Sequence, residues 1–158
     1  MNGGGPEVLA VYAVAWIALH TGHHLGDYWV QTHHQAGAKA GPGWTGRLAC
    51  ARHVVTLTAT QAALLGLTVI VVPVRFSVVQ VLAALTVNAL SHYWADRRTT
   101  LLALAQRLER VAGKGSFARV GVPRPGRDDL ASLGTGAVAL DQAWHTAWLM
   151  IAALLIAA

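Results

Sequence analysis

The sequence has few charged residues, and four long stretches contain none. Charged residues make up 12% of the 158-residue chain, about half the share of a typical globular protein, whereas 54% of residues are hydrophobic. No Asp, Glu, Lys or Arg occurs in residues 8–26, 54–74, 76–95 or 142–158. A helix needs about 20 apolar residues to cross a bilayer core about 30 Å thick. The pattern therefore predicts an all-α integral membrane four-helix bundle; the alternative is a soluble globule with unusually apolar buried helices.

Cysteine is scarce, and the amino-terminal segment has no basic residue. Cys50 is the only cysteine, which excludes an internal disulfide and a CxxC metal site. No Lys or Arg precedes Lys39, whereas a secretory signal peptide begins with a positively charged region. The sequence also lacks HExxH, which excludes a zincin-type protease.

The domain organisation follows from the charge-free stretches and from where the charges collect. We predict a single transmembrane domain over 1–158, with spans at about 7–31, 48–72, 76–98 and 138–158. The connecting loops are 32–47 and 99–137. Residues 32–52 and 97–138, which include these loops and the adjoining helix ends, hold 11 of the 12 Lys and Arg, and the opposite side holds only Glu7 and Arg75. The positive-inside rule then places both loops in the cytoplasm and both termini outside.

This topology explains the excess of basic over acidic residues, so no nucleic-acid partner is expected. The net charge of +5 lies mostly in loops that would face the membrane surface. The expected partner is the lipid bilayer itself, with anionic headgroups as a secondary partner. The sequence leaves the oligomeric state open.

Residues 99–112 have a different character from the long apolar stretches. Leu101, Leu104, Ala105 and Leu108 recur near helical spacing, with charged residues between them. This predicts an amphipathic helix on the inner membrane surface, between the third and fourth spans. The alternative is that the third helix continues into the cytoplasm. Residues 113–136 contain Gly, Pro and charges without a period, which predicts a loop.

Each predicted helix carries one polar face, because residues three or four apart share a face of a helix. At this spacing lie His20, His23, Asp27 and Gln31, then His53, Thr56 and Thr60, then Asn88, His92 and Asp96, then Asp141 and His145. Lipid would penalise these faces unless they pointed into the bundle. Ionisable residues within membrane segments are functional-site candidates by default.

The polar residues of all four helices fall at one depth in the predicted topology, near the cytoplasmic boundary. We therefore predict one shared site whose side chains converge. Its candidate metal ligands are His23, His24, Asp27, His53, His92, Asp96, Asp141 and His145. Imidazole and carboxylate together suit a divalent metal, with zinc favoured and manganese or iron as alternatives. Asp27, Asp96 and Asp141 are also the candidate catalytic residues, and Gln31 and Gln142 are candidates to orient a bound cofactor.

Several of these residues have simpler interpretations. His24, His33 and His34 could anchor a helix at the membrane interface. Asp96 precedes Arg97 and Arg98, so it could balance their charge, and Asp141 could favour a helix amino terminus.

Three functions are compatible with the pattern. The leading hypothesis is a metal-dependent membrane hydrolase at the cytoplasmic leaflet, acting on a lipid headgroup or another amphipathic ester, because a bound metal lowers the pKa of water. The alternatives are transport of a divalent cation or protons, and a non-enzymatic membrane scaffold or phage-linked interaction protein. The outer halves of the first and last helices are almost wholly apolar, which ranks transport lower.

The assembled motifs resemble a family of small bacterial and phage membrane proteins, domain of unknown function 3307. That family's pattern is an HxxxD block followed by an aromatic residue and a Gln, a lone His, a second HxxxD block with a basic residue, and a DQxxH block. The matching positions are His23, Asp27, Tyr28 and Gln31, then His53, then His92, Asp96 and Arg97, then Asp141, Gln142 and His145. The resemblance spans about residues 20–150, and the basic loop 113–137 departs from it. It implies a multi-pass bacterial inner-membrane protein, but no activity.

Overall fold

The computed structural model describes residues 4–122 and 135–158, whose regular secondary structure is all helical, with no strand among them. Four helices are long: α1 (Gly5–Leu25), α3 (Gly43–Val71), α4 (Val78–Asp96) and α8 (Gly136–Ala157). A π-helical turn, η1 (Gly26–Val30), extends α1. The shorter helices are α2 (His33–Ala38), α5 (Thr99–Arg107), α6 (Glu109–Ala112) and α7 (Lys114–Ala118).

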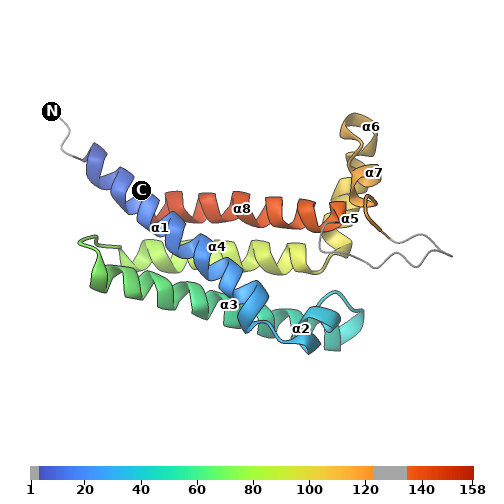
Figure 1. Ribbon diagram of the computed structural model, residues 1–158, viewed down its shortest axis with the longest axis horizontal. Helices are drawn as coiled ribbons and strands as arrows, with labels where there is room; N and C mark the ends of the chain where they lie inside the picture. The colour runs from blue at the N-terminus through green and yellow to red at the C-terminus, as the bar shows by residue number, and fades with distance from the viewer. Residues whose placement is uncertain (1–3, 123–134) are drawn as a thin grey trace.

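The four long helices pack side by side, with α1 crossing the others at an angle (Figure 1). Helix α1 contacts α3 and α8, and α4 contacts α3 and α8, so every long helix has two long neighbours. The described ends of the chain lie at the same end as the turn between α3 and α4, whereas α2, α5, α6 and α7 lie at the other end (Figure 1). This arrangement brings the end of α1, the first half of α3, the end of α4 and the start of α8 to a common level.

An apolar core fills the half of the molecule nearer the termini. It is built from small and branched side chains that are almost completely buried, among them Leu19, Leu65, Ala84, Leu149 and Ala152. Small residues also bring α1 close to α3. A Cβ atom on Gly22 would lie 2.9 Å from the Cα atom of Gln61, so only glycine permits this approach.

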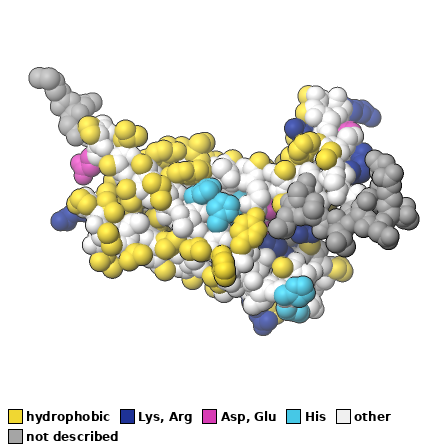
Figure 2. All heavy atoms as spheres, viewed as in Figure 1, with side chains coloured by type: hydrophobic (Ala, Val, Ile, Leu, Met, Phe, Trp, Pro, Cys, Tyr) yellow, Lys and Arg dark blue, Asp and Glu magenta, His cyan; other side chains and the backbone are white. Residues whose placement is uncertain are grey.

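The outward faces of the long helices are apolar as well. Figure 2 shows hydrophobic side chains covering much of the elongated body, with most Lys and Arg gathered at the end that carries the short helices. Ile17, Ile70 and Leu90 are each more than half exposed. Three helical segments are long and apolar enough to cross a membrane, namely Gly5–Val30, Gly43–Val71 and Gly136–Ala157. Such a surface indicates a membrane protein.

Helix α4 is not among these three segments, although the sequence pattern predicts a span there. Its 19 residues include Asn88, Ser91, His92 and Asp96, which lower its mean hydropathy. The all-helical class is confirmed, and the predicted spans correspond to long helices in the structure. The coarse prediction of several membrane helices therefore holds, and a crossing by α4 is part of the proposal below.

The segments between the long helices differ from the sequence-based expectation. Helix α3 begins at Gly43, several residues before the predicted 48. Loop 32–47 contains α2, which Thr32 caps by accepting a hydrogen bond from the backbone N–H of Gln35 while the Gln35 side chain accepts one from the backbone N–H of Thr32.

The amphipathic segment is separate from α4. Arg98 has a φ of +51°, a conformation that cannot continue a helix, so the alternative of one continuous third helix is wrong. Helix α5 buries Leu101 and Ala105 and exposes Arg107, as an amphipathic helix does. The predicted loop 113–136 begins with the short helix α7, and the rest of that prediction, from 123 to 134, lies outside the described residues.

Candidate metal centre

The predicted polar faces converge where the four long helices meet. The side chains of His23, His53, His92, Asp96 and His145 are each at most 2% exposed. They come from α1, α3, α4 and α8, whose helical phase turns each of them inward. The expected convergence of Asp27, His53, Asp96 and His145 is confirmed by the distances between them.

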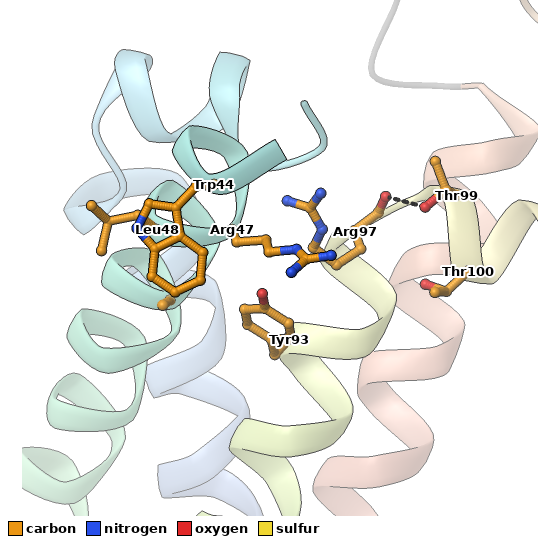
Figure 3. Close-up of a pocket in the computed structure, with 8 residues that line it drawn as sticks. Trp44, Arg47, Leu48, Tyr93, Arg97, Thr99 and Thr100 are labelled. Carbon is orange, nitrogen blue, oxygen red and sulfur yellow. Dashed lines mark hydrogen bonds between the residues drawn. The ribbon is translucent and has the colours of Figure 1, made fainter. Parts of the chain in front are cut away.

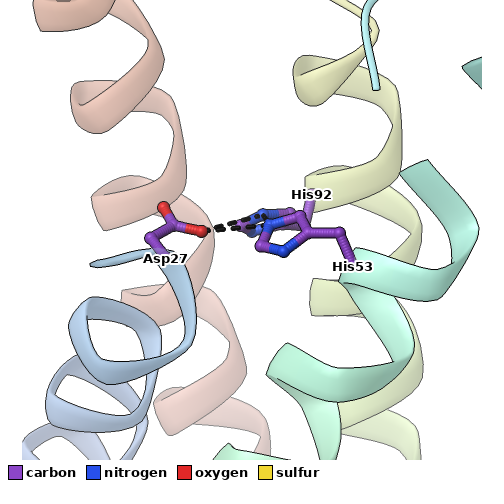
Figure 4. Close-up of side chains that lie close together, drawn as sticks. All are labelled: Asp27, His53 and His92. Carbon is purple, nitrogen blue, oxygen red and sulfur yellow. Dashed lines mark hydrogen bonds and ion pairs between the residues drawn. The ribbon is translucent and has the colours of Figure 1, made fainter. Parts of the chain in front are cut away.

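The closest group lies between α3, α4 and η1. The Nε2 atoms of His53 and His92 are 3.1 Å apart. Asp27 Oδ1 lies 3.1 Å from the first nitrogen and 3.6 Å from the second, and Figure 4 shows both rings turned toward this carboxylate. Asp96 Oδ2 lies 3.2 Å from each nitrogen. Two imidazole nitrogens and two carboxylate oxygens therefore gather around one small volume.

These separations are those expected of ligands around one cation. Zinc–nitrogen and zinc–oxygen bonds of about 2.0–2.1 Å in tetrahedral geometry place ligand atoms about 3.3 Å apart. The ligand atoms of Asp27, His53 and His92 lie within 4.8 Å of one another, and so do those of His92, Asp96 and His145. Either group could hold a metal ion. One Nε2 atom has a single lone pair, so His92 can serve only one ion at a time.

The buried polar atoms also lack sufficient hydrogen bonds without a cation. Among the described residues, Asp27 Oδ1 and His145 Nε2 are buried and make no hydrogen bond of acceptable geometry. Such atoms are costly to bury. If both His53 and His92 were protonated, their charges would repel at this distance. A divalent cation among them would satisfy the oxygens and the nitrogens together, so the residues present fit a metal ion.

A second group extends the site toward α8. Asp96 Oδ1 lies 3.8 Å from His145 Nε2, which is 3.5 Å from Asp141 Oδ1. The rings of His92 and His145 stack with centroids 4.0 Å apart. Because Asp96 directs one oxygen to each group, it is placed as a bridging carboxylate would be.

His23 on α1 and Gln142 on α8 contact each other at the edge of the cluster. His23 Nε2 lies 3.5 Å from Asp27 Oδ2 and 3.4 Å from the side-chain oxygen of Gln142. Gln142 therefore holds His23 rather than a metal directly. The predicted orienting role of Gln142 toward a bound cofactor stays a prediction.

His24 and Gln31 depart from the expectation. The His24 side chain is exposed, and its ring stacks on Tyr28 instead of reaching the cluster, because it lies one residue off the buried face of α1. Gln31 follows the π-helical turn and is half-buried, and none of the described hydrogen bonds joins its side chain to the cluster. The structure therefore brings seven of the eight predicted ligands together, without His24.

Lys39 is a member of the cluster that the sequence pattern missed. Its Nζ atom lies 3.0 Å from Asp96 Oδ2, and the side chain is 11% exposed. The loop that carries it is held by Arg97, which donates hydrogen bonds of 2.6 Å to the carbonyl oxygens of Lys39 and Gly41. The only sequence signal was a single basic residue within the glycine-rich stretch 37–43, which has no periodicity.

The cluster is most open at Asp141. Its side chain is 23% exposed, compared with 8% for Asp27 and 2% for Asp96. Asp141 lines a cavity of about 130 Å³ together with Arg98, Leu101, Val138 and others. Asp141 is the one cluster residue among those that line this cavity beside α5.

Comparison of the chain with family models, with curated proteins and with solved structures finds no match. The geometry of the cluster is therefore the main indication of function.

Proposed function

We propose that the chain is a membrane-embedded, metal-dependent hydrolase with its metal centre at the cytoplasmic boundary. The observation that carries this proposal is the group of four ligand atoms from Asp27, His53, His92 and Asp96, whose nitrogen–nitrogen and nitrogen–oxygen separations lie between 3.1 and 3.6 Å. Zinc fits this donor set best, with manganese or iron as alternatives.

The proposed setting is the bacterial inner membrane, with α1, α3, α4 and α8 as four spans. In this arrangement α2, α5, α6 and α7 lie on the cytoplasmic side, and both termini lie outside. The basic residues at the short-helix end support this orientation through the positive-inside rule. The two HxxxD blocks and the DQxxH block support membership of the domain of unknown function 3307 family, which remains part of the proposal.

The roles of the residues follow from their contacts. Asp27, His53, His92 and Asp96 would hold the ion, and Gln142 would keep His23 in place beside Asp27. With a coordination position left open for water, a bound divalent metal would supply Lewis acidity and lower the pKa of that water. Asp141 is the accessible carboxylate of the cluster, so it would accept a proton from the attacking water and return it to the alcohol that leaves as the ester bond breaks.

The substrate class follows from the surroundings of Asp141. Its cavity combines the apolar side chains of Leu101, Leu102 and Val138 with the positive charge of Arg98. Such walls suit an ester that has both an apolar and an anionic part. We therefore propose a lipid headgroup or a similar amphipathic ester reached from the cytoplasmic leaflet.

Transport of a divalent cation is the second candidate, because polar contacts continue past the cluster. Asn88 donates a hydrogen bond of 3.0 Å to Gln61, which donates one of 3.1 Å to the carbonyl oxygen of Leu19. Beyond this pair the buried residues are the apolar core of Leu65, Leu85 and Leu149. An ion would have to cross that layer, so hydrolysis is the better-supported function. In a scaffold, by contrast, the cluster would act only through interhelical polar contacts, which contribute about 0.6 kcal/mol each.

The test separates metal binding from catalysis. The purified protein is loaded with zinc, manganese or iron in detergent, and release of products from short-chain phospholipids and carboxylic esters is measured. We expect Asp141→Asn to retain the metal but to lose activity by a factor of about 10² or more, as for a general base. We expect His92→Ala to lose both. An active Asp141→Asn protein would contradict the assigned role, and a metal-loaded protein that moves ions into vesicles without hydrolysing any ester would favour transport.

A further inference from the structure

A second pocket lies outside the metal centre. It has a volume of about 640 Å³ and opens between α3 and α4, at the end that carries α2 and α5 (Figure 3). None of the residues lining it belongs to the histidine–aspartate cluster. They are Trp44, Arg47, Leu48, Ala51, Tyr93, Arg97, Thr99 and Thr100.

The pocket concentrates positive charge without a counterion. Figure 3 shows the guanidinium groups of Arg47 and Arg97 next to each other, close to the hydroxyl of Tyr93. No Asp or Glu is among the lining residues, and within the described part of the chain Arg47 takes part in no ion pair. Adjacent like charges repel each other. An anion bound between the two groups would relieve that repulsion and accept several charge-assisted hydrogen bonds.

One of the two arginines is already held in position. Arg97 donates to the carbonyl oxygens of Lys39 and Gly41, which fixes its side chain but does not neutralise its charge. A guanidinium group has five N–H donors, so others remain for a ligand. Because Arg97 has already lost its rotamer freedom, binding an anion here costs less entropy than binding it to a free side chain.

The rest of the lining suits a lipid more than a small soluble anion. Trp44 is 75% exposed, and Tyr93 is half-buried beside it. Amphipathic rings of this kind favour the level of the headgroups in a membrane. One helical turn deeper, Val55 lies on the face of α3 that carries Ala51, and Leu90 lies on the face of α4 that carries Tyr93. Both are about two-thirds exposed, so acyl chains could lie along them below a phosphate held by the arginines.

We propose that this pocket binds the phosphate group of an anionic phospholipid from the adjacent leaflet. The site depends on the chain lying in a membrane, but it does not depend on the metal or on hydrolysis. Arg47 supplies the more exposed positive charge, Arg97 the fixed one, and the Tyr93 hydroxyl can donate a further hydrogen bond to the phosphate.

The test compares lipid retention by full-length variants in detergent. The protein is mixed with equal amounts of phosphatidylglycerol and phosphatidylcholine, and the retained lipid is counted by native mass spectrometry. We expect the wild type to prefer phosphatidylglycerol, and Arg47→Gln to weaken that preference about tenfold, since charge-assisted hydrogen bonds are lost. Arg52→Gln is the matched control, because Arg52 is an exposed arginine on the same helix that does not line the pocket. It should bind like the wild type.

A second variant and a competition with inorganic phosphate distinguish the remaining outcomes. Tyr93→Phe provides a second probe if Arg47→Gln does not fold, and we expect it to weaken the preference by a factor of about two to five, as for one lost hydrogen bond. Equal loss in Arg47→Gln and Arg52→Gln would overturn the proposal, because it would indicate a diffuse charge effect. An absence of lipid preference in the wild type would also overturn it. Displacement of the lipid by millimolar inorganic phosphate, with the same dependence on Arg47, would indicate a small-anion site instead.

Discussion

Asp96 is the residue on which the candidate site most depends. One of its carboxylate oxygens lies 3.2 Å from both His53 and His92, and the other lies 3.8 Å from His145. The same carboxylate contacts Lys39 at 3.0 Å. It therefore joins residues from four separate parts of the chain. Its immediate neighbour Arg97 points instead to the loop carbonyl oxygens, so balancing that arginine is not its only role.

Lys39 leads to a prediction about metal affinity. Its ammonium group and a divalent cation would compete for the same Asp96 oxygen and would repel each other. We expect Lys39→Met to bind zinc more tightly by about tenfold, since a nearby positive charge is removed from a buried site. Zinc competition against a chelating dye measures this change, with Lys114→Met as the control at a half-buried position on α7, outside the cluster. Weaker binding in Lys39→Met would show that the lysine helps to form the site.

The sequence predicted most of the site's residues but not all of their positions. Spacing by three and four residues correctly placed His23, Asp27, His92 and His145 on inward faces. The spacing could not decide whether His24 faces the cluster. Adjacent residues differ by about 100° around a helix, and the packing of α1 selects which one faces inward. The spacing missed Lys39 because a loop has no periodicity from which a tertiary contact could be read.

At the scale of elements, the close packing of α1 and α3 positions the first half of the site. Gly22 precedes His23, and its missing side chain lets α1 approach Gln61 closely. Gly26 precedes Asp27 and has a similar contact, with a Cβ there lying 2.9 Å from Leu57. The glycines therefore set the distance between the helix that carries Asp27 and the helix that carries His53.

Glycine substitutions test this packing. We expect Gly22→Ala to lower the free energy of unfolding by about 1–3 kcal/mol, because the new methyl group would overlap the backbone of α3. Gly66→Ala is the matched control in a long helix, since nothing lies within 4 Å of its added Cβ. It should leave stability unchanged or raise it slightly. Unfolding in a detergent–denaturant titration measures both variants, and equal effects would show that Gly22 does not control the helix spacing.

The positions of the long helices were predictable to within a few residues, because a long apolar run can form few structures other than a helix. The short helices α2 and α7 lie in predicted loops, whereas α5 and α6 lie in the predicted amphipathic segment 99–112, whose separation from α4 the sequence left open. The capping box of Thr32 and Gln35 starts α2, and the positive φ of Arg98 separates α5 from α4. The sequence contained the residues of the capping box, but the glycines of that stretch outweighed them in the prediction of a loop.

At the scale of the whole molecule, the open question is whether α4 crosses the membrane. If it does, Arg75 and Lys114 lie on opposite sides, whereas both lie outside if α4 does not cross. We replace Cys50 with Ala and introduce Arg75→Cys or Lys114→Cys singly. A membrane-impermeant maleimide should label Arg75→Cys in intact cells, and it should label Lys114→Cys only after permeabilisation. Labelling of both in intact cells would contradict a four-span topology.

The most direct test of the metal centre is the metal content of the purified protein. We expect about one zinc, manganese or iron ion per chain after reconstitution and removal of excess metal, given a donor set of two imidazoles and two carboxylates. His53→Ala should lose the ion, whereas His24→Ala should keep it, because only the first side chain faces the cluster. A wild-type protein with only trace metal, or equal losses in the two variants, would contradict a metal centre at this position.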